Sequence, residues 1–161
     1  NSFDVVSDVD LMEVSNAIQQ AIKEIRQRFD FKGSVSDVTL EKEILTLTSD
    51  DETKLKSVID IVQTKLVKRG VSLKALDYGT IQPAAKGSVR QLVTIKKGIA
   101  SDKAKEIVKF IKGTGVRVQA AIQEDQVRVS GKKRDDLQAI MQQLKAQDFG
   151  IDLQFTNFRT N

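Results

Sequence analysis

The chain has 161 residues but no cysteine and no histidine, and it has a single proline and a single tyrosine. Without cysteine it can form no disulfide, no thiolate nucleophile and no zinc–thiolate or iron–sulfur site, and this composition is typical of the reducing cytoplasm. Without histidine it lacks the most common general base and the most common metal ligand. We therefore expect a cytoplasmic protein that is not an enzyme and that holds no metal and no cofactor.

Long apolar segments are also missing. The sequence has no window of about 18 apolar residues that could cross a membrane, and no basic-then-apolar leader of the secretory type. The apolar share of 40% and the charged share of 30% are ordinary for a globular protein. These features predict a protein without a membrane partner.

What the chain does contain is one hydrophobic pattern that occurs twice. A shift of 82 residues aligns the two halves, with Ile25 on Ile107, Phe29 on Ile111, Leu40 on Ile122, Leu45 on Val127, Leu55 on Leu137 and Val62 on Leu144. Solenoid repeats are shorter, roughly 20–50 residues, so this period indicates a duplicated small domain. Each copy of about 80 residues is only marginally able to form its own core.

Both copies predict the element order β-α-β-β-α-β. The predicted strands are 2–7, 35–40, 43–48 and 71–75 in the first copy, and 89–96, 116–122, 126–130 and 153–158 in the second. Asp10 with Glu13 and Ser49 with Glu52 predict the helix starts of the first copy, and residues 77–88 are the only linker candidate. The fold class is therefore α+β: two tandem ferredoxin-like domains, each with helices on one face of an antiparallel sheet.

Charge is divided unevenly between the two halves. Residues 1–80 hold 11 Lys/Arg and 14 Asp/Glu, whereas residues 81–161 hold 15 Lys/Arg and 8 Asp/Glu, giving net charges of −3 and +7. A basic half indicates an anionic partner for the second copy. The alternative is that the extra lysines only keep the protein soluble.

The candidate binding residues combine charge with a predicted place on the open sheet face or at a helix start. They are Arg117, Gln119, Arg128, Lys132, Arg134 and Lys97. The strand residues Arg117, Gln119 and Arg128 are predicted to face away from the helices, where guanidinium and amide groups suit phosphates and base edges. Lys132 and Arg134 begin the last helix, where backbone N–H groups favour an anion. A solvated polar face that binds nothing is the alternative.

Two other kinds of site are disfavoured. RNA-recognition motifs stack bases on aromatic residues of the middle strands, whereas Phe3, Phe29, Phe155 and Phe158 are predicted here to lie in the core. A ferredoxin-like acylphosphatase would need an arginine and an asparagine that converge on a phosphate, and neither Asn16 nor Asn157 gives sequence support for such a pairing.

Eight motifs give the chain a resemblance to a known family. They are Ser2–Ser7, Arg28–Gly33, Leu66–Gly70, Lys97–Ile99, Val118–Gln119, Gln126–Lys132, Arg134–Ala139 and Gln154–Arg159. Over essentially its whole length the sequence resembles the YajQ family of bacterial proteins. The resemblance implies two ferredoxin-like domains that exchange their first strands. The first would comprise 8–80 plus strand 89–97, the second and basic one 98–161 plus strand 1–7, and residues 77–88 would be the crossover.

The resemblance also implies a function. Members of this family are described as nucleotide-binding proteins, some of which respond to cyclic di-GMP, and nucleic acid has also been proposed as a ligand. We therefore expect a non-enzymatic protein that binds a nucleotide (a cyclic dinucleotide, GTP or ATP) or RNA through its second domain. The alternative is a protein-interaction scaffold or transcription co-regulator that binds a transcription regulator and no nucleotide.

Overall fold

The computed structural model describes residues 1–160 and forms two compact units. The first unit is Val9–Lys96, and the second unit combines Asn1–Asp8 with the chain from Lys97 onward. The chain therefore passes from one unit to the other after Asp8 and returns after Lys96.

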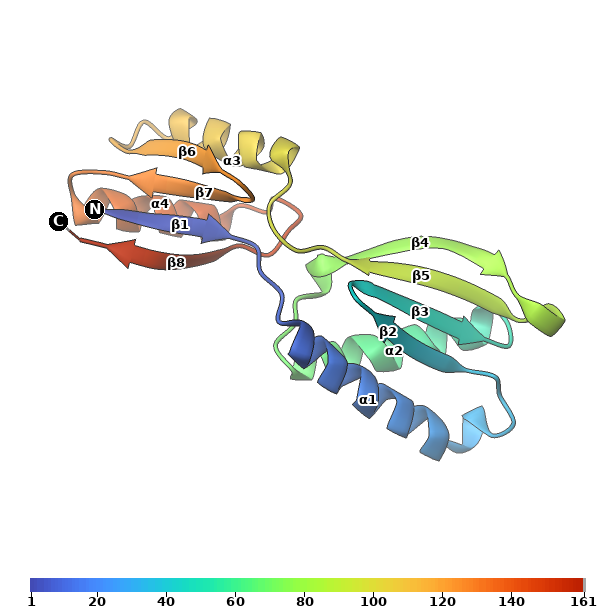
Figure 1. The fold of residues 1–161 in the computed structure, drawn as a ribbon. Coiled ribbons are helices and arrows are strands. Elements are labelled where there is room, and N and C mark those ends of the chain that lie inside the picture. The colour runs from blue at the N-terminus through green and yellow to red at the C-terminus, as the bar shows by residue number, and fades with distance from the viewer. Residues whose placement is uncertain (161) are drawn as a thin grey trace. The chain divides into compact units, whose positions relative to one another are not determined.

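The second unit has a four-stranded antiparallel sheet in the order β6-β7-β1-β8. Its elements are β1 (Ser2–Val6), α3 (Ser101–Gly113), β6 (Gln119–Gln123), β7 (Gln126–Ser130), α4 (Arg134–Ala146) and β8 (Gln154–Arg159). The two helices cover one face of the sheet and leave the other open (Figure 1). Strand β1 pairs with both β7 and β8, so it is a central strand of a sheet made otherwise from the far end of the chain.

The first unit repeats this arrangement with a sheet in the order β2-β3-β5-β4. Its elements are α1 (Leu11–Gln27), β2 (Asp37–Glu41), β3 (Ile44–Ser49), α2 (Glu52–Lys68), β4 (Leu76–Pro83) and β5 (Val89–Ile95), with short 3-10 turns at Phe29–Phe31, Leu73–Ala75 and Ala85–Gly87. Here β5 takes the central place that β1 takes in the second unit. The α+β class, the two ferredoxin-like sheets and the exchange of first strands are thus confirmed.

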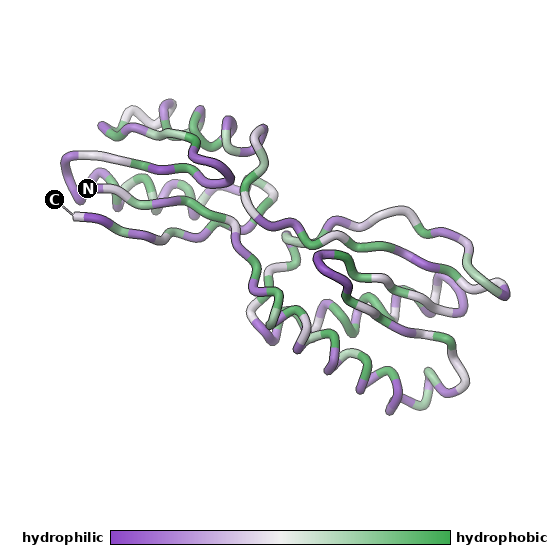
Figure 2. The backbone as a smooth tube through the Cα atoms, viewed as in Figure 1, coloured by the Kyte–Doolittle hydropathy of each residue, from purple (hydrophilic) through white to green (hydrophobic). Residues whose placement is uncertain are grey.

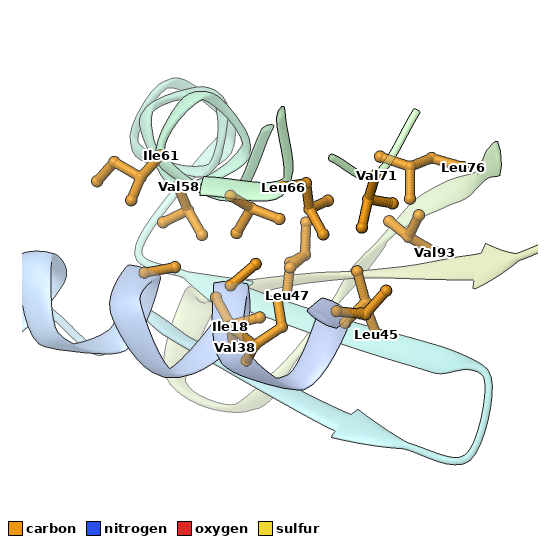
Figure 3. Packing of buried hydrophobic residues seen from close by; sticks show 14 of the residues in the cluster. Ile18, Val38, Leu45, Leu47, Val58, Ile61, Leu66, Val71, Leu76 and Val93 are labelled. Carbon is orange, nitrogen blue, oxygen red and sulfur yellow. The ribbon is translucent and has the colours of Figure 1, made fainter. Parts of the chain in front are cut away.

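Each core is completed by the exchanged strand. In the second unit Phe3 and Val5 of β1 are fully buried, and the Phe3 ring lies 5.8 Å from that of Phe155, between centroids. In the first unit Val93 and Ile95 of β5 are buried in the core cluster that also contains residues of α1 and α2, and Figure 3 shows Val93 beside Val71 and Leu76. Burying an apolar side chain of this size stabilises the fold by about 1.5–3 kcal/mol. The two β1 residues alone therefore bind this strand firmly to its sheet.

The predicted periodicities place most helices and strands correctly. Figure 2 shows apolar and polar residues alternating around each helix, as expected for an amphipathic helix on a sheet. Helix α1 begins where predicted, because the Asp10 carboxylate accepts hydrogen bonds from the backbone N–H of Met12 and Glu13. Helix α2 begins later than predicted: its cap is Asp51, while Ser49 is buried and bonds to Ser36.

The segment 71–88 differs from its prediction. Residues 71–75, expected as a strand, contain a 3-10 turn, and most of the expected crossover 77–88 belongs to β4. Glycine and proline suggested a linker, but β4 is an edge strand with a register shift between Tyr78 and Ile81. Glycine and proline are both tolerated in an irregular edge strand of this kind. A Cβ on Gly79 would lie 3.0 Å from the Leu92 carbonyl oxygen, so this glycine allows close strand pairing.

Two residues expected in the core lie on the surface. Phe29 is 86% exposed because α1 ends at Gln27, and the 3-10 turn that follows buries Phe31 instead. Phe158 is 59% exposed near the end of edge strand β8. The shift of 82 residues therefore fails where the first helix of each copy ends.

Candidate functional site

A hollow of about 760 Å³ lies at one end of the second unit, and we call it the β7–α4 hollow. Three of the predicted site residues, Arg117, Gln119 and Lys132, line it together. Lys133 and Asp136 from the start of α4 also line it. Three cations therefore face one carboxylate in a space large enough for a nucleotide, since ligand pockets have volumes of about 300–1,000 Å³.

The loop between β7 and α4 is held in place by the start of β1. The backbone N–H of Gly131 donates to the Asn1 carbonyl at 3.0 Å, and the Asn1 side-chain amide donates to the Lys132 carbonyl at 3.0 Å. A Cβ on Gly131 would lie 3.2 Å from Val118, so the loop also packs closely on the segment that carries Arg117. These contacts fix the backbone between the two groups of cations.

The N-terminus of α4 opens toward the same hollow. Its cap residue, Lys133, makes no side-chain hydrogen bond to the first turn within residues 1–160, whereas α1 and α2 are capped by aspartates. Uncapped N–H groups at a helix N-terminus favour an anion, as does the helix dipole. Asp135 and Asp136 in the first turn supply part of this negative charge.

The open face beside the hollow carries a second group of polar residues around Asp4. This carboxylate, only 2% exposed, accepts hydrogen bonds from Arg128 Nε at 2.9 Å, from Asn157 Nδ2 at 2.7 Å and from Arg159 Nη2 at 3.4 Å. The bond from Arg128 is the main cause that lowers the pKa of Asp4 below its usual range, although burial acts in the opposite direction. We call these four residues the Asp4 cluster.

The Asp4 cluster changes two expectations. Arg128 is on the open face as predicted, but it is paired with a carboxylate and is therefore not a free cation. Asn157 and two arginines do converge, as an acylphosphatase would require, yet they converge on the protein's own carboxylate. Asp4 therefore occupies the point at which these three side chains meet.

The other two predicted residues lie outside the hollow. Arg134 is the first residue of α4 and is exposed, but it does not line the β7–α4 hollow. Lys97 lies near Asp8, with 3.8 Å between its Nζ and the carboxylate, beyond the opposite end of β1. The structure therefore brings Arg117, Gln119 and Lys132 together and leaves Arg128, Arg134 and Lys97 apart from them.

Strand exchange also changes the charge argument. The first unit contains 14 Lys/Arg and 12 Asp/Glu and the second contains 12 Lys/Arg and 10 Asp/Glu, so each has a net charge of +2. The second unit gains Asp4 and Asp8 with β1, while Lys86, Arg90 and Lys96 belong to the first. The contrast of −3 and +7 between the halves is therefore absent from the folded units. An anionic ligand is favoured by the local clustering of cations, not by the net charge of a unit.

The predicted site residues leave out Lys133, Ser130, Asp4, Asn157 and Arg159, although Lys133 belongs to the basic segment at the start of the last helix. Lys133 could have been found, since it directly follows Lys132 at the helix start. Asp4 alternates with the buried Phe3 and Val5, which would have placed it on the open face. Its pairing with Arg128 depends on the register between β1 and β7 and cannot be read from local pattern.

Two features are absent from the part of the chain that the structure describes. None of the helices within residues 1–160 is long and apolar enough to span a membrane. In the same part of the chain, no three acidic side chains come close enough together to hold a metal ion.

Comparison with known proteins agrees with the resemblance. The family model described as "Nucleotide-binding protein YajQ-like" matches residues 1–159. A protein of Koribacter versatilis named as a nucleotide-binding protein is 59% identical over 161 residues, which is all of this chain and 98% of the relative. Proteins of the same printed name from Desulfitobacterium hafniense and Geotalea uraniireducens are 57% identical over 159 residues and 56% identical over 158, covering 98% or more of each chain. The chain therefore belongs to the YajQ-like family of nucleotide-binding proteins.

Proposed function

We propose that this chain is a cytoplasmic, non-enzymatic protein that binds the phosphates of a nucleotide or of RNA in the β7–α4 hollow. The observation that carries the proposal is the convergence of Arg117, Lys132 and Lys133 beside an uncapped helix N-terminus. Arginine and lysine side chains and free backbone N–H groups are the usual partners of phosphate oxygens in proteins. The amide of Gln119 and the hydroxyl of Ser130 line the same space and suit a ribose or a base edge.

The Asp4 cluster extends the proposed site along the open face. Arg159 donates from Nη1 to the Ser2 hydroxyl at 3.1 Å, and Ser2 lines the β7–α4 hollow, so the cluster and the hollow adjoin. Arg128 and Arg159 remain partly exposed, which leaves their guanidinium planes available for stacking on bases. This continuity favours a ligand longer than a mononucleotide, such as cyclic di-GMP or a short single strand of RNA.

The chemistry of the site favours binding over catalysis. Histidine and cysteine are absent from the whole sequence. The carboxylate nearest to the arginines, Asp4, is buried and held ionised by its hydrogen bonds, so it is a poor general acid or base at neutral pH. A turnover assay with each bound nucleotide tests this part of the proposal, and release of inorganic phosphate or of a nucleoside would contradict it.

Calorimetric titration tests the binding site. Wild-type protein and the variant Arg117→Ala/Lys132→Ala are titrated with GTP, ATP, cyclic di-GMP and a short single-stranded RNA, at low and at physiological salt. Two lost charge-assisted contacts of about 1.5 kcal/mol each predict that affinity falls about 100-fold. The matched control, Lys105→Ala/Lys109→Ala, removes the same charge from α3 of the same unit and leaves the hollow unchanged.

The outcomes separate the alternatives. Saturable binding that weakens with salt and is lost only in the hollow variant supports the proposal, because phosphate contacts are strongly salt-dependent. Equal loss in both variants would mean that general charge, and not this site, attracts the ligand. Failure of the wild-type protein to bind any of the four ligands would leave the alternative function, a scaffold or transcription co-regulator that recognises protein alone.

A further inference from the structure

Three of the four sheet edges within residues 1–160 carry features that prevent pairing with another strand. Edge strand β2 has acidic residues at both ends, Asp37 and Glu41. Edge strand β4 contains Pro83 and a register shift, and the pairing of β1 with edge strand β8 has a second register shift. Charges, proline and irregular register are the usual means by which natural sheets protect their edges.

The fourth edge, β6, has none of these protections. Its sequence, Gln119–Gln123, contains no charge and no proline, and it pairs with β7 in unbroken register. In an antiparallel ladder every second residue of an edge strand directs its N–H and C=O groups outward. Strand β6 therefore presents a regular row of backbone groups that another extended chain could pair with.

A small hollow runs beside this edge and gives it a chemical preference. Its volume is about 260 Å³, and it is lined by Lys105, Lys109 and Lys112 of α3 together with the apolar Val108 and Ile122. Ile122, which aligns with Leu40 in the repeat, is 42% exposed because it lies on this edge strand. None of the three lysines forms an ion pair with another residue in the described part of the chain. The hollow thus offers an apolar floor and three unpaired cations.

We infer that β6 is a docking edge for an extended, acidic segment of a partner protein. The segment would pair with β6 as a fifth strand of the sheet, which is the recognition mode known as β-augmentation. Because side chains alternate along a strand, every second residue of the segment would point to the α3 side, where carboxylates would meet the lysines and apolar groups would meet Val108 and Ile122. This site does not include the cations of the β7–α4 hollow, so the inference does not depend on nucleotide binding.

Charge argues against a second copy of the same chain as the occupant. Two β6 strands could pair about a two-fold axis, but the three lysines of each copy would then lie beside the same junction. Like charges at a partly desolvated interface oppose association. An acidic peptide satisfies both the backbone edge and the lysines, whereas a second copy satisfies only the edge.

Selection of peptides on the full chain tests the inference. A displayed library of random peptides of roughly nine residues is long enough to cover β6 with overhang. It is selected on the wild-type protein and counter-selected on the variant Lys105→Glu/Lys109→Glu/Lys112→Glu. We expect the enriched peptides to alternate Asp or Glu with apolar residues, and a synthesised representative to lose at least about tenfold in affinity for the variant.

A matched variant and hydrogen exchange locate the contact. Lys23→Glu/Lys42→Glu/Lys56→Glu makes the same charge change on exposed positions of the first unit and should bind the peptide like the wild type. Bound peptide should slow amide exchange in β6 and leave exchange in β2 unchanged, since only the β6 amides gain partners. Three results would overturn the inference: no peptide enriched over the α3 variant, protection outside β6, or self-association of the free protein through β6 in sedimentation.

Discussion

The Asp4 cluster allows a sharp test, in which Asp4 is replaced by asparagine. The carboxylate accepts from Arg128 on one oxygen and from Arg128, Asn157 and Arg159 on the other. An asparagine has one acceptor oxygen, so it can keep one of these positions and must turn its own N–H groups toward donors at the other. Loss of a buried hydrogen bond to a charged group costs about 1.5–3 kcal/mol, and we expect Asp4→Asn to lower the free energy of unfolding by that amount at pH 7.

The same substitution predicts a pH dependence of known sign. Because the pKa of Asp4 is lowered below its ordinary value of 3.8, its contribution to stability is fully present above that value. The contribution is lost as the pH falls through the lower pKa of the folded state. The difference in stability between wild type and Asp4→Asn should therefore be largest at neutral pH and should shrink below pH 3.8.

Urea denaturation of both proteins at neutral and at acid pH measures these differences. Glu124→Gln in the exposed β6–β7 loop is the control, and a surface change of this kind should stay within about 0.5 kcal/mol of wild type. The reasoning would be refuted if Asp4→Asn were as stable as wild type at pH 7, or if the difference persisted unchanged at acid pH. Formate should partly restore the stability of Asp4→Ala, since the cluster then has room for a small carboxylate.

Three further tests, which use five substitutions, probe other parts of the structure by the same denaturation assay. Lys133→Ser supplies the side-chain cap that α4 lacks, so it should stabilise the protein by about 1 kcal/mol while weakening the proposed phosphate binding. Gly98→Ala should lower the free energy of unfolding more than Gly115→Ala. Both positions have positive φ, but only at Gly98 would the new Cβ meet a neighbouring atom, Oδ2 of Asp125 at 2.5 Å. Equal losses of stability would exclude that clash. Phe3→Ala should cost about 3–5 kcal/mol and Phe29→Ala almost nothing, because the first ring is fully buried and the second is 86% exposed; similar losses would contradict this assignment of the core.

The helices, most of the strands and the duplicated fold class could be predicted from the sequence because they depend on local pattern. Apolar residues at three- and four-residue steps define α1 through its buried Val14, Ile18 and Ile25, and alternation defines β3 through its buried Leu45 and Leu47. The prediction failed where local pattern and tertiary position disagree. The glycine and proline of β4 suggested a linker, because these residues usually mark turns and loops. They occur in β4 because it is an edge strand, where both are tolerated.

The candidate site was predicted only in part, for a related reason. Three predicted site residues meet in one hollow: Arg117, Gln119 and Lys132. They lie in or next to β6 and α4, two elements whose order was predicted correctly. Arg128 was placed on the correct face of its strand, but its partner Asp4 lies 124 residues away in the chain. No local pattern encodes such a contact.

The sequence by itself determined the element types, the duplication, and the absence of thiol and imidazole chemistry, because these follow from composition and from spacing along one segment. Only the tertiary structure decided the charge of each unit, the pairing of Arg128 with Asp4 and the unprotected edge at β6, and it confirmed the strand exchange that no local pattern showed and that the family resemblance alone had implied. The physical reason is that strand pairing and register are set by long-range burial. Phe3 and Val5 gain their burial only in the sheet formed by the other end of the chain.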